Sequence, residues 1–491
     1  MSSSAVKFLL ISFDGLRPEM VTQELMPRLY QHAQVGVTFR NSRCTYPTET
    51  YVNQPSFVTG STPSRHGMIA NFYLDPNVDP RECFKGFSVE SIEKAQRAYD
   101  GRLYDADSLG EILQRAGRSM AVVCTNSPGS VRLLHHQVQD HKHLSMSCFT
   151  PETSYPPDEV SEITSKLGKL SPMTVPDFEG TTYATDVFLE HVCRGELPDL
   201  SILWYGEPDV SYHSYGVGSP ESKKVLSHVD AEFGRVIDWW NASGLRDSLQ
   251  IIVMSDHGHV TQKTKVATGD LLRDAGFKVD VHLEDGADLA LNPAYCGGIR
   301  VRDNKPDLIR AVGQALMEQD SCGMVFSAGR NEVEGIIPGS FSKRLVMVDH
   351  PRSPDIYYIL RTDDEPNEYG YIGNCFYESG LPLGGGVHGG LHPIELHNLC
   401  LASGSLFGKG QRVETHAGII DIAPTILHCL GITAPETMDG RVLYEAFTEY
   451  TPDLPGSVPE TFEVGIDSYK QVLHRSRVGD ACYLDGGWRS Q

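Results

Sequence analysis

Six side chains that could bind a metal ion follow apolar runs of the sequence or lie in a glycine-rich loop. Aspartates close two of the runs, in "LLISFDG" and "IIVMSDHG". Carboxylates combined with imidazoles are typical ligands of zinc or a similar first-row divalent ion, whereas oxygen ligands alone would suit magnesium or calcium. The six candidates are Asp14, Asp209, His213, Asp256, His257 and His388.

Each candidate also has a structural interpretation. Asp14 and the following glycine form a common turn sequence, and the glycines around His388 in "GGGVHGG" also mark ordinary loops. Asp256 and His257 favour a functional interpretation, because polar groups at the end of a buried strand need partners. Asp209 and His213 are four residues apart, which would place them on one face of a helical turn, or on a loop whose ends converge. Three nearby histidines are left outside the set: His259, which is adjacent to it, and His392 and His397, which are interpreted as structural.

The stretch "CTYPTETYVNQPSFVTG", residues 44–60, gathers hydroxyl side chains at the start of a short helix signal. One interpretation is helix capping, in which side-chain oxygens accept the free N–H groups of the first turn. The other makes one threonine a nucleophile, because the same N–H groups and the helix dipole can hold a phosphate. On the second interpretation, Thr50 is a seventh candidate ligand.

Short apolar runs alternate with longer amphipathic segments along the chain. Runs such as "KFLLISF", "MAVVC" and "LSILWYG" are separated by helical patterns, of which "SKKVLSHVDAEFGRVIDWW" is one. This alternation predicts an α/β sandwich, in which helices cover both faces of a mostly parallel sheet. Ligands of such sheets bind outside the carboxyl ends of the strands, which is where the candidate metal ligands are expected.

The length of 491 residues favours a large domain with insertions, or two to three domains. A small α+β insertion is expected to cap the site, with the main sheet resuming near Asp355. The predicted divisions are a first part of the core at 1–275, the cap at 276–345, a second part of the core at 346–449 and a C-terminal extension at 450–491.

The composition excludes some partners. The formal net charge of −22 disfavours a nucleic-acid duplex or an anionic membrane as the main partner. The eleven cysteines are scattered without C-x-x-C spacing, which favours reduced thiols. Neither a cleavable leader pattern nor an apolar run of about 18 residues is present, so a cytoplasmic protein is expected. The C-terminal extension is either an ordered element or a dimer arm, so a homodimer is one expectation.

Five motifs in order along the chain resemble the nucleotide pyrophosphatase/phosphodiesterase branch of the alkaline phosphatase superfamily. They are "FDGLRPE", "YPTETYVNQPSFVTGSTPSRHGMIANFY", "EPDVSYHSYG", "SDHG" and "GVHGG". The resemblance covers the region from Asp14 to His388. It implies an alkaline-phosphatase-like three-layer α/β/α sandwich and a catalytic site with two zinc ions.

The resemblance also implies a role for each candidate residue. The first zinc set would be Asp209, His213 and His388, and the second would be Asp14, Thr50, Asp256 and His257. Thr50 matches the nucleophile of the family, and Asn71 matches the asparagine that helps bind a non-bridging phosphoryl oxygen. Thr48 is then left as a local turn or cap residue. The implied reaction is hydrolysis of a phosphodiester or nucleotide pyrophosphate bond through a phospho-threonine intermediate.

Three other functions compete with this one. Sulfatase chemistry is disfavoured, because Cys44 is followed by "TYP" and no arginine completes the required motif. Phosphonoacetate-like hydrolysis of a carbon–phosphorus bond at the same site is the enzymatic alternative, with Arg132 as a substitute for the lysines of that relative. A non-catalytic metal-binding scaffold is the third, although no ligand and no nucleophile is missing.

The substrate is expected to be a small phosphate ester, a nucleotide or a phosphonate. The aromatic residues Phe72, Tyr73 and Tyr205 would either stack on a base or line an apolar slot, or simply pack in the core.

Overall fold

The central strand of the protein is β1 (Lys7–Phe13), whose apolar sequence "KFLLISF" is buried almost throughout. A computed structural model describes residues 6–141, 143–449 and 455–490. In it, β1 pairs in parallel with β8 (Leu200–Tyr205) on one side and with β9 (Leu249–Met254) on the other. A strand covered on both faces needs a continuous apolar run, as these three strands have.

The main sheet contains eight strands, of which only β20 runs antiparallel to its neighbours. Their order is β21 (Gln411–Val413), β2 (Val37–Phe39), β20 (Cys400–Ser403), β9, β1, β8, β6 (Met120–Cys124) and β7 (Leu144–Ser147). The predicted mostly parallel sheet is thereby confirmed.

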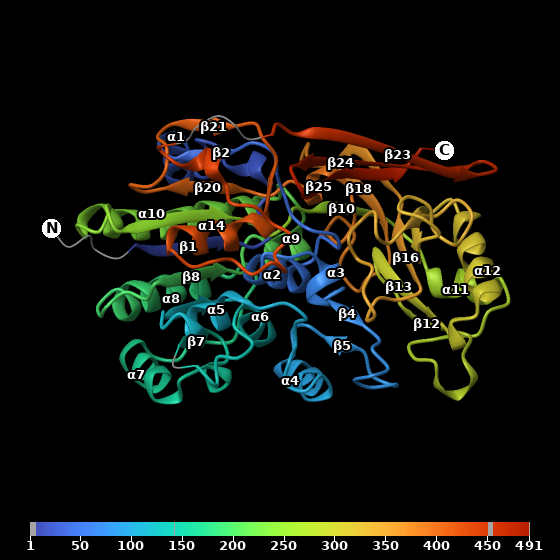
Figure 1. Ribbon diagram of the computed structural model, residues 1–491, viewed down its shortest axis with the longest axis horizontal. Helices are drawn as coiled ribbons and strands as arrows, with labels where there is room; N and C mark the ends of the chain where they lie inside the picture. Colours follow the sequence, from blue (N-terminus) through green and yellow to red (C-terminus); the bar gives the residue numbers. More distant parts are fainter. Residues whose placement is uncertain (1–5, 142, 450–454, 491) are drawn as a thin grey trace.

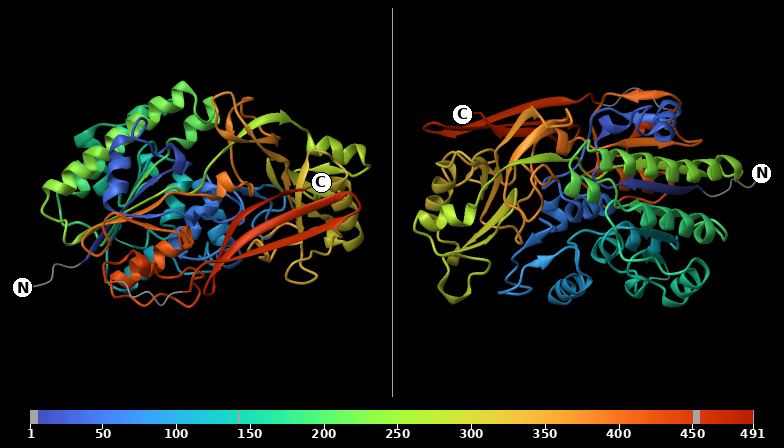
Figure 2. Two further views of the ribbon diagram at one scale, coloured as in Figure 1. Left: turned by 90° about the horizontal axis from the view of Figure 1, so that it is seen from above. Right: turned by 180° about the vertical axis from the view of Figure 1, so that it is seen from behind.

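Helices cover both faces of this sheet (Figure 2). Phe8 and Leu10 of β1 pack in one apolar cluster, whereas Leu9 and Ile11 point to the other. This alternation is the two-residue period of a strand. The helices of the first face are α2 (Thr50–Thr59), α5 (Leu109–Arg115), α6 (Pro128–Leu134) and α14 (Ile422–Cys429). Those of the second face are α1 (Pro27–Val35), α7 (Pro157–Leu167), α8 (Phe178–Val187) and α10 (Pro220–Ala242). The predicted three-layer sandwich is confirmed.

A second, six-stranded sheet lies beside the sandwich, at the right of Figure 1. Its order is β11 (Val279–Asp280), β12 (Leu289–Asn292), β13 (Cys296–Val301), β16 (Ile356–Leu360), β14 (Cys322–Ser327) and β15 (Phe341–Ser342). Helices α11 (Thr268–Asp274) and α12 (Pro306–Met317) belong to the same part of the chain. This sheet forms the expected α+β insertion.

The expectation that the main sheet resumes near Asp355 is wrong. The strand that follows this residue, β16, pairs with β13 and β14 of the second sheet. The main sheet resumes only at β20. The run "IYYIL" is apolar enough to be buried in either sheet, so its sequence does not specify its partners. The exact domain boundaries stay a prediction.

A small four-stranded sheet connects the two larger parts. Its order is β17 (Thr362–Pro366), β18 (Ile372–Tyr377), β10 (Val260–Lys265) and β19 (Gly386–Val387). Strands β10 and β19 are antiparallel, with Val260 opposite Val387. This pairing brings His388, which follows β19, back to the residues that precede β10.

The chain ends in a three-stranded antiparallel sheet, drawn in red in Figure 1. It contains β23 (Val458–Ile466), β24 (Tyr469–Val478) and β25 (Ala481–Arg489). Asp485 of β25 forms an ion pair with Arg43, and Tyr483 donates a hydrogen bond to Asp421, so the described part of the extension, residues 455–490, is an ordered element joined to the core. Whether it also serves as a dimer arm stays a prediction. None of the described helices combines the length and apolar character needed to cross a bilayer.

Candidate metal centre

The predicted ligands meet at the carboxyl ends of the central parallel strands. Asp14 follows β1, Asp256 follows β9, and Asp209 begins helix α9 (Asp209–Tyr215) after β8. The helix places His213 one turn after Asp209, as the spacing of four residues indicates. The loop after β19 supplies His388. Residues that are far apart in the sequence therefore meet at one edge of the sheet, as expected for an open α/β fold.

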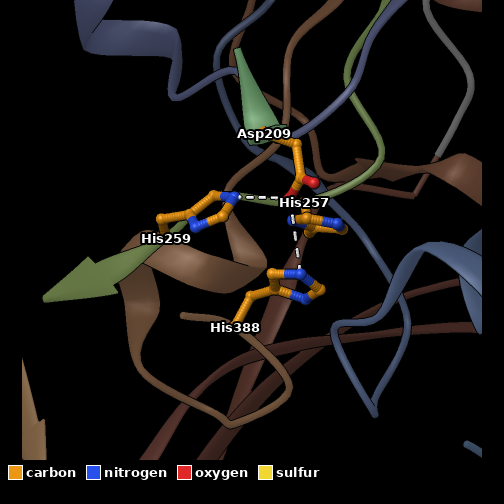
Figure 3. Close-up of side chains that lie close together, drawn as sticks. All are labelled: Asp209, His257, His259 and His388. Carbon is orange, nitrogen blue, oxygen red and sulfur yellow. Dashed lines mark hydrogen bonds and ion pairs between the residues drawn. The ribbon is translucent and has the colours of Figure 1, made fainter. Parts of the chain in front are cut away.

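The first group of ligands surrounds one oxygen of Asp209. The Nε2 atoms of His213 and His388 lie 3.3 and 3.4 Å from Asp209 Oδ1. A third imidazole, that of His259, has its Nε2 2.8 Å from the same oxygen. Figure 3 shows two of these contacts, those made by His259 and His388.

The second group surrounds His257. Its Nε2 lies 3.5 Å from Asp14 Oδ1, 3.5 Å from Asp256 Oδ2 and 3.0 Å from the hydroxyl of Thr50. The Thr50 hydroxyl also lies 3.4 Å from Asp14 Oδ1. The two groups are adjacent, because the rings of His257 and His388 stack with their centres 3.8 Å apart. The structure thus brings all seven predicted ligands together in two sets.

Backbone carbonyl groups hold the three predicted histidine ligands in one tautomer. The Nδ1 atoms of His213, His257 and His388 lie 2.7, 3.2 and 2.8 Å from the carbonyl oxygens of residues 386, 258 and 48, respectively. A carbonyl oxygen can only accept, so each Nδ1 carries the proton and each Nε2 presents a lone pair to the cluster. This is the usual arrangement of metal-binding histidines, and it fits a pair of transition-metal ions.

The electrostatics of the carboxylates also fit a cation. Burial, reinforced by the neighbouring aspartates, raises the pKa of Asp14 well above its ordinary value. Burial raises the pKa of Asp256 to about 7, and its Oδ2 has no hydrogen-bond partner among the described residues. Burial also opposes ionisation of Asp209, but the charge and hydrogen bonds of the surrounding histidines hold its pKa well below the ordinary value. Uncompensated buried carboxylates are costly, and divalent cations at this position would remove that cost.

His259 is a member of the cluster that sequence reasoning left out. Because the ionised carboxylate of Asp209 can only accept, the Nε2 of His259 donates to it. Its Nδ1 is buried without a hydrogen-bond partner in the described structure, unlike the Nδ1 atoms of the three predicted ligands. His259 therefore orients Asp209. The signal was present in "DHGH", since residues two apart in an extended segment point to the same side.

Gly15 makes room for His259 beside the first strand. Its φ of +69° is in the left-handed region that favours glycine. A Cβ on this residue would lie 2.6 Å from His259 Nε2. The glycine of the Asp14-Gly15 turn is thus required both by the turn and by the histidine packed against it.

The start of helix α2 brings the Thr50 hydroxyl to the cluster. Thr50 is the first helical residue, and the side chain of the N-cap residue Glu49 makes no capping bond. The Oδ1 of Asn71 accepts the N–H of Tyr51 at 3.0 Å, so the predicted phosphoryl-binding residue lies against the first turn. Its other side-chain atom, Nδ2, is a donor that this contact leaves available.

Thr48 does not cap the helix but supports the loop of His388. Its carbonyl oxygen accepts from His388 Nδ1, and its hydroxyl accepts from the N–H of Gly389 at 2.9 Å. The same hydroxyl faces the carbonyl of Gly390 at 3.1 Å. Of the two roles expected for Thr48, local turn or cap, the cap role is therefore wrong. The reason is tertiary: the loop after β19 packs on this residue and takes both of its polar groups.

The remaining aromatic and basic candidates differ in their burial and contacts. Tyr205 is completely buried and Tyr73 nearly so, as expected for packing residues. Phe72 is 40% exposed, and it lines a cavity of about 50 Å³ beside Glu49. Residues of the six-stranded sheet complete the walls of this cavity. Arg132 is buried, and its Nη1 lies 3.4 Å from Oε1 of Glu93. Nothing in these contacts supports the role considered for it in phosphonate binding.

Comparisons with known proteins agree with the architecture. The family model of type I phosphodiesterase / nucleotide pyrophosphatase matches residues 8–369. The human ectonucleotide pyrophosphatase/phosphodiesterase family member 1 is 29% identical over 252 residues, 51% of this chain and 23% of that protein. The mouse bis(5′-adenosyl)-triphosphatase is 28% identical over 439 residues, 88% of this chain and 78% of that protein. The chain thus spans about a quarter of the first relative and about three quarters of the second.

A solved structure shows the same fold. It is the murine ectonucleotide pyrophosphatase/phosphodiesterase 5, an inactive threonine-to-alanine variant in complex with AMP. It superposes with a TM-score of 0.58 and 21% sequence identity over 88% of this chain and 96% of that chain.

Proposed function

The chain belongs to the type I phosphodiesterase/nucleotide pyrophosphatase family, and from that premise we propose that it is a metal-dependent hydrolase. It would cleave phosphodiester or nucleotide pyrophosphate bonds, with Thr50 as the nucleophile. The observation that carries the proposal is the position of the Thr50 hydroxyl. It starts a helix, contacts the His257 and Asp14 group, and lies beside the group centred on Asp209.

Two zinc ions are the proposed cofactors. One would be held by Asp209, His213 and His388, and the other by Asp14, Thr50, Asp256 and His257. When bound, such ions lower the pKa of a coordinated hydroxyl and neutralise charge that develops in phosphoryl transfer. Mixed carboxylate and imidazole ligands, with each ligand imidazole fixed by a carbonyl group, support zinc over magnesium.

The protein's own residues position the reacting groups. Thr50 Oγ forms a bond to phosphorus as the bond from phosphorus to the leaving oxygen breaks, which gives a phospho-threonine and a free alcohol or phosphate. Water then attacks the phosphorus and restores the Thr50 hydroxyl. The Nδ2 of Asn71, anchored to the first turn through its Oδ1, would donate to a non-bridging oxygen in both steps.

The relatives support nucleotides as the substrate class. The solved structure of murine ectonucleotide pyrophosphatase/phosphodiesterase 5 is that of an inactive threonine-to-alanine variant in complex with AMP, and the mouse relative is named as a bis(5′-adenosyl)-triphosphatase. The cavity beside Glu49 and Phe72 is the proposed site of the substrate group next to phosphorus. The cytoplasmic location and the homodimer stay predictions.

Hydrolysis of bis-p-nitrophenyl phosphate tests the proposal directly. The zinc-loaded protein is expected to release p-nitrophenol, and exhaustive chelation is expected to abolish the reaction. A panel of phosphomonoesters, diesters, dinucleoside polyphosphates and phosphonoacetate, compared by kcat/KM, then assigns the substrate class. Activity that survives both chelation and Thr50→Ala would exclude this mechanism, and a complete lack of activity on the panel would favour the non-catalytic scaffold.

A further inference from the structure

A second cluster of histidines lies between helix α6 and strand β7. His135 ends the helix, and His141 and His143 lie in the turn before the strand. The three ring centres are 5.0, 5.3 and 5.5 Å apart. One nitrogen of each ring lies within 4.8 Å of one nitrogen of each of the others.

This cluster is separate from the candidate metal centre. His143 precedes β7, and its Nε2 lies 3.2 Å from the carbonyl oxygen of Arg118, just before β6. The cluster therefore lies at the amino ends of two parallel strands, whereas the candidate metal centre lies at the carboxyl ends. None of its three residues has a role in the proposed hydrolysis.

Two nitrogen atoms of the cluster lack the partners that protein groups would normally supply. His143 Nε2 donates to the Arg118 carbonyl, so its Nδ1 presents a lone pair, which accepts from His135 Nε2 at 2.8 Å and which a cation would take over in place of this proton. The Nδ1 atoms of His135 and His141 are buried and have no hydrogen-bond partner in the described structure. Unpaired buried polar atoms are uncommon, and several in one cluster call for an explanation.

The protonation states suit metal binding. Burial lowers the pKa of all three imidazoles, and the neighbouring histidines lower those of His135 and His143 further. The rings are therefore neutral near pH 7, which is the form that binds metal ions. The carboxylates of Asp140 and Glu111 act in the opposite sense on His141, so negative charge is also close to the cluster.

The ring spacing matches a tetrahedral metal site. With metal–nitrogen distances of about 2.0–2.1 Å, three imidazoles around one ion have their centres about 5 Å apart. A packing role alone would explain the buried rings and the hydrogen bond between His135 and His143, but not the two buried Nδ1 atoms that lack a partner. We propose that His135, His141 and His143 bind a Zn²⁺ ion or a similar first-row divalent cation, with water at the fourth position.

Such an ion would connect the end of α6 to the starts of β6 and β7. The other end of α6 adjoins the candidate metal centre, where Asn126 donates to Asp14 at 2.6 Å and Ser127 contacts the Tyr51 hydroxyl at 3.1 Å. The cation would thus have a structural role, as a fixed support for a helix whose first residues contact the candidate metal centre.

The test compares the zinc content of the full-length wild type, His141→Gln and His141→Ala after equilibration with Zn²⁺ and removal of free metal. His141 is chosen because it is the least buried of the three residues, and His428→Ala, which removes an exposed histidine elsewhere, is the matched control. Both His141 variants are expected to bind one ion fewer per chain than the wild type and the control. They are also expected to gain less in Tm on Zn²⁺ addition, with unchanged circular dichroism.

A second probe separates this proposal from the proposed hydrolytic function. Co²⁺ bound by three imidazoles and water gives visible absorption bands, and the difference spectrum of wild type minus His141→Ala isolates those of the proposed site. The zinc difference is expected whether or not the chain hydrolyses any phosphate ester, and the hydrolytic rate of a His141 variant is expected to equal that of the wild type. Equal zinc content and equal Tm gain in wild type and both His141 variants would overturn the proposal.

Discussion

The two histidine clusters of this protein share one hydrogen-bonding arrangement but differ in the side chains around it. In both, a backbone carbonyl group accepts a hydrogen bond from one ring nitrogen of a histidine, so the other nitrogen presents a lone pair. The candidate metal centre adds three buried aspartates and a hydroxyl to its imidazoles, whereas the cluster of His135, His141 and His143 contains imidazoles alone. The charged groups and the hydroxyl would make the proposed phosphoryl transfer feasible at the first site, and their absence from the second triad suits a structural role.

The electrostatic cost of the two clusters differs for the same reason. Burial raises the pKa values of Asp14 and Asp256, so the candidate metal centre is unfavourable without a cation. Burial lowers the pKa values of the second triad, whose rings are neutral, so without a metal ion it carries the cost of two unpaired nitrogens but not that of buried charge. Without a cation, the buried charge of the candidate metal centre therefore lowers the stability of the fold, and the second triad has no such charge.

The largest expected effect is that of Thr50→Ala. Loss of the proposed nucleophile is expected to lower kcat/KM by roughly 10³-fold or more, while the ions of both clusters are largely retained. Steady-state hydrolysis and zinc analysis measure the two quantities. Thr59→Ala, which removes a hydroxyl at the other end of the same helix, is the control and is expected to keep its activity. If the Thr50→Ala variant hydrolyses substrate at a rate near that of the wild type, Thr50 is not the nucleophile. The proposed functional difference between the two clusters would then have no support.

Asp256→Asn tests whether the buried carboxylate of Asp256 destabilises the protein when no cation is bound. In the chelated wild type, the folded-state pKa of about 7 is above the ordinary value of 3.8, so stability from this group is present at low pH and lost as the pH rises through 7. The asparagine has no such loss and can still accept from Gly15 and His257. The variant's stability relative to the wild type is therefore expected to increase between about pH 4 and about pH 7, by on the order of 1 kcal/mol per pH unit.

Urea denaturation of the two chelated proteins across this pH range measures the effect. With Zn²⁺ present, the order is expected to reverse, because the variant lacks one anionic ligand. A stability difference that does not change with pH in the chelated proteins would show that Asp256 carries no such electrostatic cost.

A smaller effect is expected for His259→Ala. Loss of the hydrogen bond to Asp209 leaves that carboxylate free to rotate, so zinc affinity is expected to fall by about 10–100-fold. Competition with a chelator measures the affinity, and the activity lost is expected to return at high zinc concentration. His392→Ala, another buried histidine paired with a carboxylate, is the matched control. Activity that zinc does not restore would mean that His259 acts on the substrate instead.

The smallest effect is expected for Thr48→Val. The change removes the hydroxyl that faces Gly389 and Gly390 but keeps the carbonyl that holds His388. Unpairing one buried N–H group is expected to cost about 1–2 kcal/mol of unfolding free energy, with less than about a tenfold change in rate. Urea denaturation and kinetics measure both. A loss of activity as large as that of Thr50→Ala would assign the nucleophile to the wrong threonine.

Much of the architecture could be predicted from local sequence patterns. Continuous apolar runs such as "KFLLISF" require a strand buried on both faces, and the polar residues that follow them must then lie at the ligand-binding edge of the sheet. This is why the positions of Asp14 and Asp256 could be anticipated. The pairing of β16 could not be, because its apolar sequence suits either sheet.

The sequence by itself determined the layered fold, the edge of the sheet where polar side chains meet and which seven side chains were predicted to gather there. Only the tertiary structure decided that His259 orients Asp209, that Thr48 supports the His388 loop and that three histidines face one another before β7. The physical reason is the distance along the chain over which each kind of interaction acts. Periodicity and capping act over a few residues, whereas a hydrogen-bond partner is set by which distant loops the packed strands bring together.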